Sequence, residues 1–312
     1  SMLFSNARKA TLGFLALCLL VAVLLMFSGC LQAPPAQPSG KLRVVATFYP
    51  IYDFAKNVGG DRVEVSTIIP VGVEPHDYDP SPSSMRAVAG ADVFIYNGAG
   101  LEPWAQQLIS GAGSPSLISV DSSQGIGLIS QQESGFAGTD PHIWLNPVLA
   151  KKQVANIRDA FIQADPEGKA QYESNAAVYI SKLDSLDSQL RAEFSTCKKK
   201  DILITHATLA YFCLEYGCRQ IAIEGVNEEG EPSAMDIVKI IEQAKANSVT
   251  SVFFESMVNP QSAELVAGEI KGTASVFNSV HGLTQEEQNS GEDYISLMRA
   301  NLGNVKKALD CN

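Results

Sequence analysis

The four histidines are the residues of this chain best suited to chemistry, and they are spread along its length at His76, His142, His206 and His281. Each one lies just after a predicted strand or in a loop at a strand end. Neutral imidazole is the commonest protein ligand for metal ions, and nitrogen-rich sites suit zinc, copper, nickel and cobalt. If the strands belong to sheets that face each other at their carboxyl ends, all four imidazoles can converge on one ion.

The sequence around the histidines predicts rigid loops. Prolines flank His76 by one and four residues, and His142 follows Pro141 directly. Asp140 is placed to accept the second ring N–H of His142, as carboxylates beside metal-binding histidines do. A lone histidine is more often structural than functional. Four histidines at equivalent positions are much harder to attribute to chance.

Strands and helices alternate on both sides of the middle of the chain. Short apolar strands between amphipathic helices indicate α/β lobes with mostly parallel sheets flanked by helices. We place these lobes at residues 41–146 and 197–312. The predicted strands span residues 42–47, 63–69, 92–97, 116–120, 201–205, 220–224, 251–255 and 274–278.

Residues 147–196 are predicted to form connecting helices. Pro147 to Ala164 reads as one helix, and Asp165 with Pro166 provides a plausible N-cap and first residue for a second, longer one. Apolar residues on the second helix recur every three or four positions from Tyr172 to Phe194. One long rigid helix bridging two lobes is the natural interpretation, and a coiled-coil helix is the alternative.

The first 40 residues predict export rather than folded structure. Arg8 and Lys9 precede an apolar run that is too short to span a membrane and suits a signal peptide over residues 1–29. The run ends in small residues before Cys30, which predicts lipidation there; an uncleaved anchor is the alternative. Residues 30–40 are proline-rich and read as a spacer. We therefore expect an extracytoplasmic protein anchored to the cell membrane through Cys30.

The net charge limits the possible binding partners, and the cysteines limit the possible disulfides. A net charge of −11 makes nucleic-acid binding unfavourable, because nucleic acids are bound by clustered cations. We also expect the protein to be a monomer. Export permits disulfides. Besides Cys30, the exported part contains four cysteines: Cys197, Cys213, Cys218 and Cys311. Four cysteines can pair in three ways, and the sequence does not rank them.

Five segments carry a family resemblance: PHDYDPSPS, DPHIWLNP, THATLAYFCLEYG, GEPSA and FFES, in this order. Together they resemble the substrate-binding lipoproteins of metal-ion ABC importers of the zinc and manganese type. The resemblance covers nearly the whole chain from Lys41 onward. It implies two α/β lobes bridged by one long helix, a metal ion held between them, and delivery of that ion to a membrane permease.

The resemblance also implies a ligand set. The family's first three ligand positions correspond to His76, His142 and His206, and a histidine at the third position favours Zn²⁺ over Mn²⁺. Family members commonly carry an aspartate as fourth ligand at the end of the last strand, where this chain has Asn278, whose neutral amide is a weak zinc ligand. We expect His281 to fill this position, with water as the alternative. Glu255 is expected to support a ligand or the packing of a lobe rather than to bind metal.

The main hypothesis is a binding protein without catalytic activity that captures Zn²⁺. Two alternatives remain. Three histidines with an open fourth position also describe a catalytic zinc site, as in an exported hydrolase, although the chain has no HExxH motif. Alternatively, the protein binds an organic ligand such as a siderophore or corrinoid, which would leave four strand-end histidines without a role.

Overall fold

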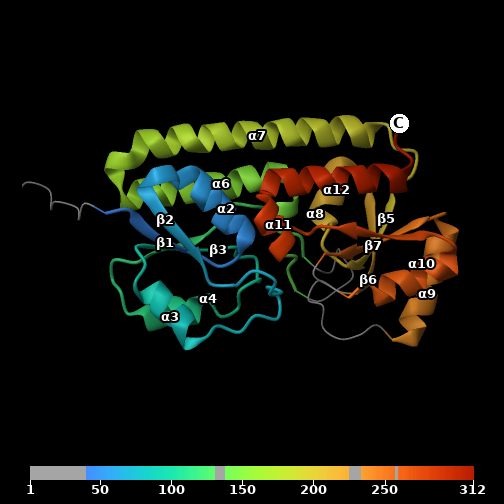
Figure 1. The fold of residues 1–312 in the computed structure, drawn as a ribbon, viewed down its shortest axis with the longest axis horizontal. Helices are drawn as coiled ribbons and strands as arrows, with labels where there is room; N and C mark the ends of the chain where they lie inside the picture. Colours follow the sequence, from blue (N-terminus) through green and yellow to red (C-terminus); the bar gives the residue numbers. More distant parts are fainter. Residues whose placement is uncertain (1–39, 131–137, 225–232, 257–258) are drawn as a thin grey trace, which may run out of the picture. The chain divides into compact units, whose positions relative to one another are not determined.

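The computed structural model describes residues 40–130, 138–224, 233–256 and 259–312. The predicted signal peptide, the spacer and Cys30 therefore lie outside the described residues. Lys41–Asn312 forms one compact unit, with two sheets and the helices that cover them (Figure 1). Among the described helices, none combines the length and apolar character that crossing a bilayer requires.

The two sheets have the same topology. The first has the order β2-β1-β3-β4 and the second the order β6-β5-β7-β8, and every neighbouring pair is parallel. All the predicted strands are present, with ends shifted by up to two residues. Their bounds are β1 Leu42–Ala46, β2 Val63–Thr67, β3 Val93–Tyr96, β4 Ile118–Asp121, β5 Asp201–His206, β6 Arg219–Glu224, β7 Ser251–Glu255 and β8 Thr273–Phe277.

Helices cover both sheets. In the first lobe α2 and α6 pack on one side of the sheet, while α3 and α4 pair on the other (Figure 1). In the second lobe α12 packs on β5 and β8, and α9 and α10 pack on strands β6 and β7. The helix bounds are α2 Tyr49–Gly59, α3 Pro82–Ala89, α4 Ala105–Ala112, α6 Pro147–Ala164, α7 Lys169–Ser195, α8 Ala210–Tyr216, α9 Ala234–Ala246, α10 Gln261–Ile270, α11 Gln285–Ser290 and α12 Tyr294–Leu309.

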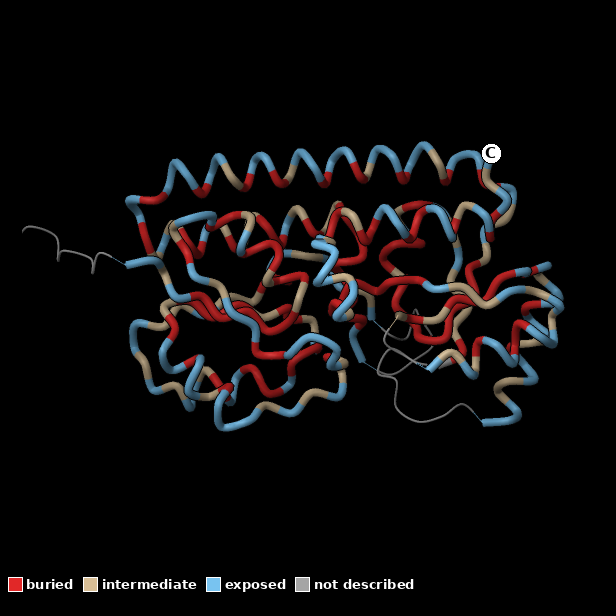
Figure 2. The backbone as a smooth tube through the Cα atoms, in the orientation of Figure 1, coloured by how far each residue is buried: buried red, intermediate tan, exposed pale blue. Residues whose placement is uncertain are grey.

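The long helix α7 contacts both lobes, with α2 and α6 on one side and α8 and α12 on the other. Its predicted apolar stripe is confirmed. The buried residues of α7 are Tyr172, Ala176, Tyr179, Leu183, Leu186, Leu190 and Phe194, and Figure 2 shows buried and exposed positions alternating along the helix. Because α7 contains no proline or glycine that would kink it, it forms one straight helix that packs against both lobes.

The start of the long helix differs from the prediction in its capping. Residues Pro166–Gly168 form a separate 3₁₀ turn, η3, and α7 begins at Lys169 after Gly168. Asp165 does not cap α7. Its Oδ2 instead accepts hydrogen bonds from Arg62 Nε at 2.7 Å and from the Tyr172 hydroxyl at 2.8 Å. These long-range bonds hold the carboxylate away from the first amides of the helix.

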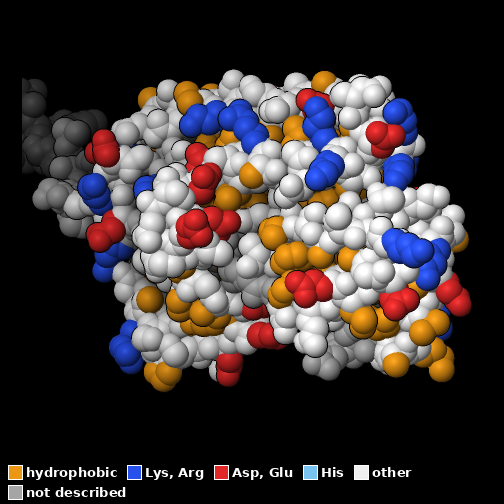
Figure 3. All heavy atoms as spheres, turned by 45° about the vertical axis from the view of Figure 1, so that its right-hand side comes forward, with side chains coloured by type: hydrophobic (Ala, Val, Ile, Leu, Met, Phe, Trp, Pro, Cys, Tyr) orange, Lys and Arg blue, Asp and Glu red, His pale blue; other side chains and the backbone are white. Residues whose placement is uncertain are grey.

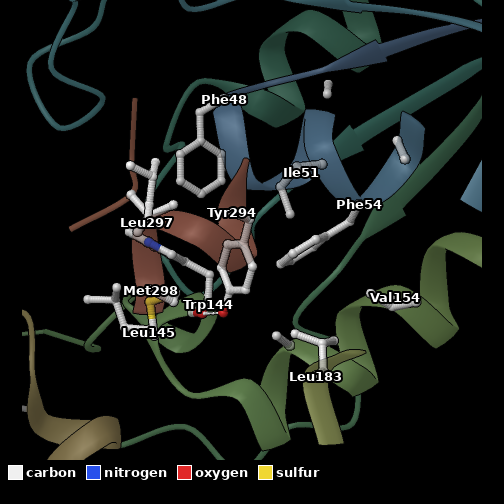
Figure 4. Packing of buried hydrophobic residues seen from close by; sticks show 14 of the residues in the cluster. Phe48, Ile51, Phe54, Trp144, Leu145, Val154, Leu183, Tyr294, Leu297 and Met298 are labelled. Atoms are coloured by element: carbon white, nitrogen blue, oxygen red, sulfur yellow. Dashed lines mark hydrogen bonds between the residues drawn. The ribbon is translucent and has the colours of Figure 1, made fainter. Parts of the chain in front are cut away.

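One apolar core runs through both lobes. Figure 4 shows Phe54 of α2 and Trp144 of η2 (Ile143–Leu145) on either side of Tyr294 of α12. Phe54 and Tyr294 meet edge to face, with ring centroids 4.9 Å apart. The Tyr294 hydroxyl donates to the Trp144 carbonyl at 2.5 Å, and Trp144 Nε1 donates to the Ser279 carbonyl at 2.7 Å. The lobes therefore share buried packing and hydrogen bonds.

The open question of cysteine pairing is partly answered. Cys197, just after α7, forms a disulfide with Cys311, just after α12. This bond joins the ends of the two helices. Cys213 and Cys218 are thiols.

Asp53 should make the stability of this core depend on pH. It is buried on α2, where the Tyr179 hydroxyl of α7 donates to Oδ2 at 2.6 Å. Burial raises its pKa to about 6, and the hydrogen bond from Tyr179 only partly offsets this. Because the folded state holds this proton more tightly than the unfolded state, stability should fall as pH rises from about 4 to 6, by at most about 3 kcal/mol.

Urea unfolding of the wild type and Asp53→Asn from pH 4 to 7 measures this effect. The variant keeps an acceptor for Tyr179 but cannot ionise, so its stability relative to wild type should increase with pH across this window. Asp61→Asn, at an exposed position, is the control and should show no such trend. A wild-type-to-variant difference that is the same at pH 4 and pH 7 would contradict the assignment.

Candidate metal centre

The histidines His76, His142 and His206 meet in one cluster. Their ring centroids are 5.0–5.1 Å apart, and one ligand atom from each lies within 4.8 Å of the others. His76 lies in the loop after β2 and His142 at the start of η2, so both belong to the first lobe, whereas His206 ends β5 in the second. His206 lies at the carboxyl end of β5 and His76 in the loop that follows β2, the side of a parallel α/β sheet where ligands bind.

The cluster lies largely below the surface, and its environment favours uncharged imidazoles at His76 and His142. His142 and His206 are at most 1% exposed, and His76 is half-buried. Burial lowers the pKa of His76 well below its usual range, and the neighbouring histidines lower it further. Burial also lowers the pKa of His142, although Asp140 partly opposes the effect. Because only neutral imidazole binds a metal ion, these two side chains are in the binding form at neutral pH.

Asp140 orients His142 as the sequence predicts. Its Oδ1 lies 2.8 Å from His142 Nδ1 and also accepts the His142 backbone N–H at 2.9 Å. This contact places the ring proton on Nδ1 and leaves the lone pair on Nε2, which lies 3.1 Å from His76 Nε2. The Tyr211 hydroxyl of α8 donates to the Asp140 carbonyl at 2.7 Å. The second lobe therefore helps to position a first-lobe histidine.

Glu255 orients His206, as Asp140 orients His142. It ends β7 and is fully buried, with Oε1 3.1 Å from His206 Nδ1 and Oε2 accepting the Ser279 hydroxyl at 2.8 Å. Burial alone would raise the pKa of Glu255, but His206 and His281 bring it down to about 2. The ionised carboxylate thus holds the His206 ring in one orientation through Nδ1.

His281 lies in a second cluster, with Glu74 and Glu255. Its Nε2 is 2.8 Å from Glu74 Oε2, and its Nδ1 is 2.6 Å from the Ser279 hydroxyl. Burial lowers its pKa, but the carboxylates of Glu255 and Glu74 outweigh this and raise it overall. The structure therefore brings three of the four histidines together. The fourth is adjacent, linked to His206 through Glu255, with Nε2 directed at Glu74.

Asn278 shapes the loop that carries His281. Its Oδ1 accepts the Val280 N–H at 2.8 Å, and its Nδ2 donates to Glu287 Oε1 at 2.6 Å. Val280 has φ +57°, a left-handed conformation that is rare for a β-branched residue. Such strain persists only when surrounding contacts impose it, and it occurs often at functional sites. Asn278 thus holds the backbone turn before His281 and links that loop to Glu287 of α11.

The sequence did not single out Glu74, Ser279 or Tyr211, although all three contact the histidines or their carboxylate partners. A weak signal exists for Glu74, because it lies two residues before His76 in the same proline-bounded loop. No comparable pattern marks Ser279 or Tyr211. Their roles depend on how the two lobes pack, which periodicity does not reveal.

Two parallel α/β lobes that share one long helix, with three imidazoles from both lobes meeting in one cluster, define a metal-binding solute-binding protein. The family model for the zinc-uptake complex component A, periplasmic (ZnuA), matches residues 44–308. The chain belongs to this family.

Named relatives agree with this assignment. The chain is 36% identical over 280 residues to the high-affinity zinc uptake system protein ZnuA of Bacillus subtilis, covering 86% of this chain and 88% of that one. It is 35% identical over 285 residues to the zinc-binding lipoprotein AdcA of Streptococcus pneumoniae, covering 88% of this chain but only 57% of that longer protein. The crystal structure of the Zn(II)-bound ZnuA-like domain of AdcA matches with a TM-score of 0.77 at 34% identity, over 87% of this chain and 100% of that domain.

Removing the carboxylate of Asp140 should weaken Zn²⁺ binding. Asp140→Ala leaves the His142 ring without the acceptor that fixes its proton on Nδ1, so the zinc dissociation constant should rise by about 10–100-fold. Asp140→Asn keeps an oxygen acceptor and should lose less. Asp159→Ala removes an exposed carboxylate on α6 and serves as the control. Competition titration with a chelating dye measures the constants; equal affinities for wild type and Asp140→Ala would contradict this role.

Proposed function

We propose that this protein captures Zn²⁺ outside the cytoplasm and delivers it to the membrane permease of an ABC importer. The observation that carries the proposal is the meeting of three imidazoles, two of them fully buried and contributed by both lobes, with ligand atoms within 4.8 Å of one another. Nitrogen-dominated sites suit Zn²⁺ better than Mn²⁺. The relatives named above are zinc uptake and zinc-binding proteins.

The proposed ligands are His76, His142 and His206, with His281 as the fourth. His281 would have to exchange its Nε2 contact with Glu74 for the ion, and the proximity of the two clusters makes this a local movement. Tetrahedral zinc readily accepts four imidazoles, or three with a water molecule. Asp140 and Glu255 would keep the ring protons on Nδ1 while the ion is bound.

A transport role suits this site better than hydrolysis. The two carboxylates in the second cluster already pair with histidines, Glu74 with His281 and Glu255 with both His206 and His281. A general base needs a carboxylate that can reach a bound water, and these are committed to orienting imidazoles. We therefore propose that the protein is not an enzyme. Imidazole rings at about 5 Å spacing also suit a single ion better than a siderophore or corrinoid.

The proposal extends to location and partners. We propose a monomer held at the membrane by a lipid on Cys30, with residues 30–40 as the spacer. On the face drawn in Figure 3, acidic and basic side chains are interspersed rather than gathered into one basic surface. With a net charge of −11, this distribution supports a function without nucleic acid.

Metal analysis of purified protein tests the function. The wild type should hold one zinc per chain after dialysis against trace zinc, and His142→Ala should hold almost none. Added Zn²⁺ should raise the melting temperature of the wild type, because a ligand that binds only the folded state stabilises it. Lys169→Ala, at an exposed position on α7, should behave as wild type. A full equivalent of zinc in His142→Ala would exclude the proposed site, and zinc-dependent hydrolysis of ester, peptide or phosphate substrates would favour the enzyme.

Acidification should release the ion. Protons and Zn²⁺ compete for the same ring nitrogens, and burial lowers the pKa of His76 and His142. Because the pKa of His281 is raised, its contribution to the affinity should already decline as the pH falls toward 6.5, and the affinity should fall more steeply at lower pH, where His76 and His142 also become protonated. Isothermal titration from pH 8 to 5 measures it. Unchanged affinity at pH 5 would argue against ligation by histidines.

A further inference from the structure

We infer that Cys213 and Cys218 form a second disulfide in the exported protein, and that this bond locks the end of α8 to the start of β6. Their sulfur atoms lie 2.6 Å apart, although five residues separate them in sequence. Both side chains thus already face each other. This inference uses only the extracytoplasmic location from the proposed function, because thiols persist in the cytoplasm and are oxidised outside it.

The end of α8 creates this proximity. Gly217 adopts a left-handed conformation with φ +70°, and the Gly217 and Cys218 amides both donate to the Cys213 carbonyl, at 2.9 and 3.1 Å. This is a helix termination that turns the chain back over the last turn. Arg219 then starts β6 directly, paired with Asp201 of β5. The backbone on both sides of the pair is therefore held by regular structure, and the sulfurs need to approach by only about half an ångström to reach bonding distance.

An oxidant can reach the sulfurs. Both cysteines line a pocket of about 490 Å³ that also includes the exposed Leu214. Cys213 is buried, whereas Cys218 is partly exposed at the pocket wall. Burial raises the pKa of the Cys213 thiol. Cys218 is therefore the residue that reacts first with a molecule from solution.

The chemistry is thiol–disulfide exchange with an external disulfide. The Cys218 thiolate attacks one sulfur of the external disulfide, forming a mixed disulfide and releasing one thiol. Cys213 then attacks the Cys218 sulfur, forming the intramolecular bond and releasing the second thiol. The two cysteines are oxidised by two electrons, the external disulfide is reduced to two thiols, and those thiols take up the two protons that the cysteines lose.

The bond would also stabilise the helix α8, which contacts the metal centre. The first turn of α8 carries Tyr211, whose hydroxyl donates to the Asp140 carbonyl and accepts from the Ile129 N–H at 3.0 Å. His206 lies only four residues before the start of α8. A fixed C-terminal end of this short helix would therefore limit its opening, and amide exchange in residues 210–218 should be slower in the oxidised form than in the reduced form.

Peptide mapping tests the inference. The full chain is incubated with oxidised glutathione, denatured, alkylated without reduction, and digested. The peptides that carry Cys213 and Cys218 should be unalkylated and lighter by two hydrogen atoms than the reduced form, while Cys197–Cys311 remains linked. In Cys218→Ser, Cys213 should become alkylated, and Cys197–Cys311 should be unaffected. Thermal melts of the variants monitor folding.

Two results would overturn the inference. The first is alkylation of both Cys213 and Cys218 in oxidised protein that contains the Cys197–Cys311 bond. The second is a stable glutathione adduct on Cys218 with Cys213 still reduced. The mapping needs no zinc, so its failure is distinct from a failure of the proposed transport function, which the metal content of the same sample reports.

Discussion

The close approach of three imidazoles is the constraint on which the rest of this structure depends. His76 and His142 present Nε2 atoms to each other at 3.1 Å, and the ring of His206 is 5.0 Å from both. Protonating any of them would place a buried charge beside the others, at a cost that burial makes high. The arrangement is stable only if each ring is neutral and held in one orientation, and a divalent ion is the ligand that such a group of lone pairs fits.

Meeting this constraint requires the two lobes to be fixed relative to each other within the compact unit. His206 belongs to the second lobe, so a small shift of one sheet against the other would separate it from its partners. The helix α7 packs against helices of both lobes, and Tyr294 and Trp144 carry buried hydrogen bonds between them. Behind the histidines, Tyr211 reaches from α8 to Asp140, and Ser279 joins Glu255 to the loop of His281. The side chains that orient the rings also join the lobes, so metal binding and lobe packing are physically coupled.

Much of the fold could be predicted from the sequence, because its strands and helices follow strong local patterns. The strands are short apolar runs, and the α7 stripe steps at helical spacing, so eight strands and the bridging helix were predicted close to their observed bounds. The helical stretch begins at Pro166 as predicted, with η3 as its first turn. The Asp165 side chain makes no capping bond because it bonds to Arg62 and Tyr172, partners that local capping rules do not anticipate. The short helix α11 was missed, since its six polar residues carry no apolar periodicity.

In the metal site, too, local patterns could be predicted and tertiary contacts could not. Positions after strands marked His76, His142 and His206, and proximity in sequence marked Asp140. The distances among the rings, and the contacts of Glu74 and Ser279 with His281, depend on tertiary packing, so the sequence could not supply them. The contact of Asn278 with the turn at Val280 likewise depends on the loop conformation, which the sequence does not show.

The most direct test of this account is an anomalous-scattering map, recorded at the zinc edge, of a crystal of the protein soaked in Zn²⁺. The account predicts one strong peak about 2.0–2.1 Å from the Nε2 atoms of His76, His142 and His206, with His281 or a water completing a tetrahedron. A map with no peak between these rings, or with the zinc bound elsewhere on the chain, would contradict it.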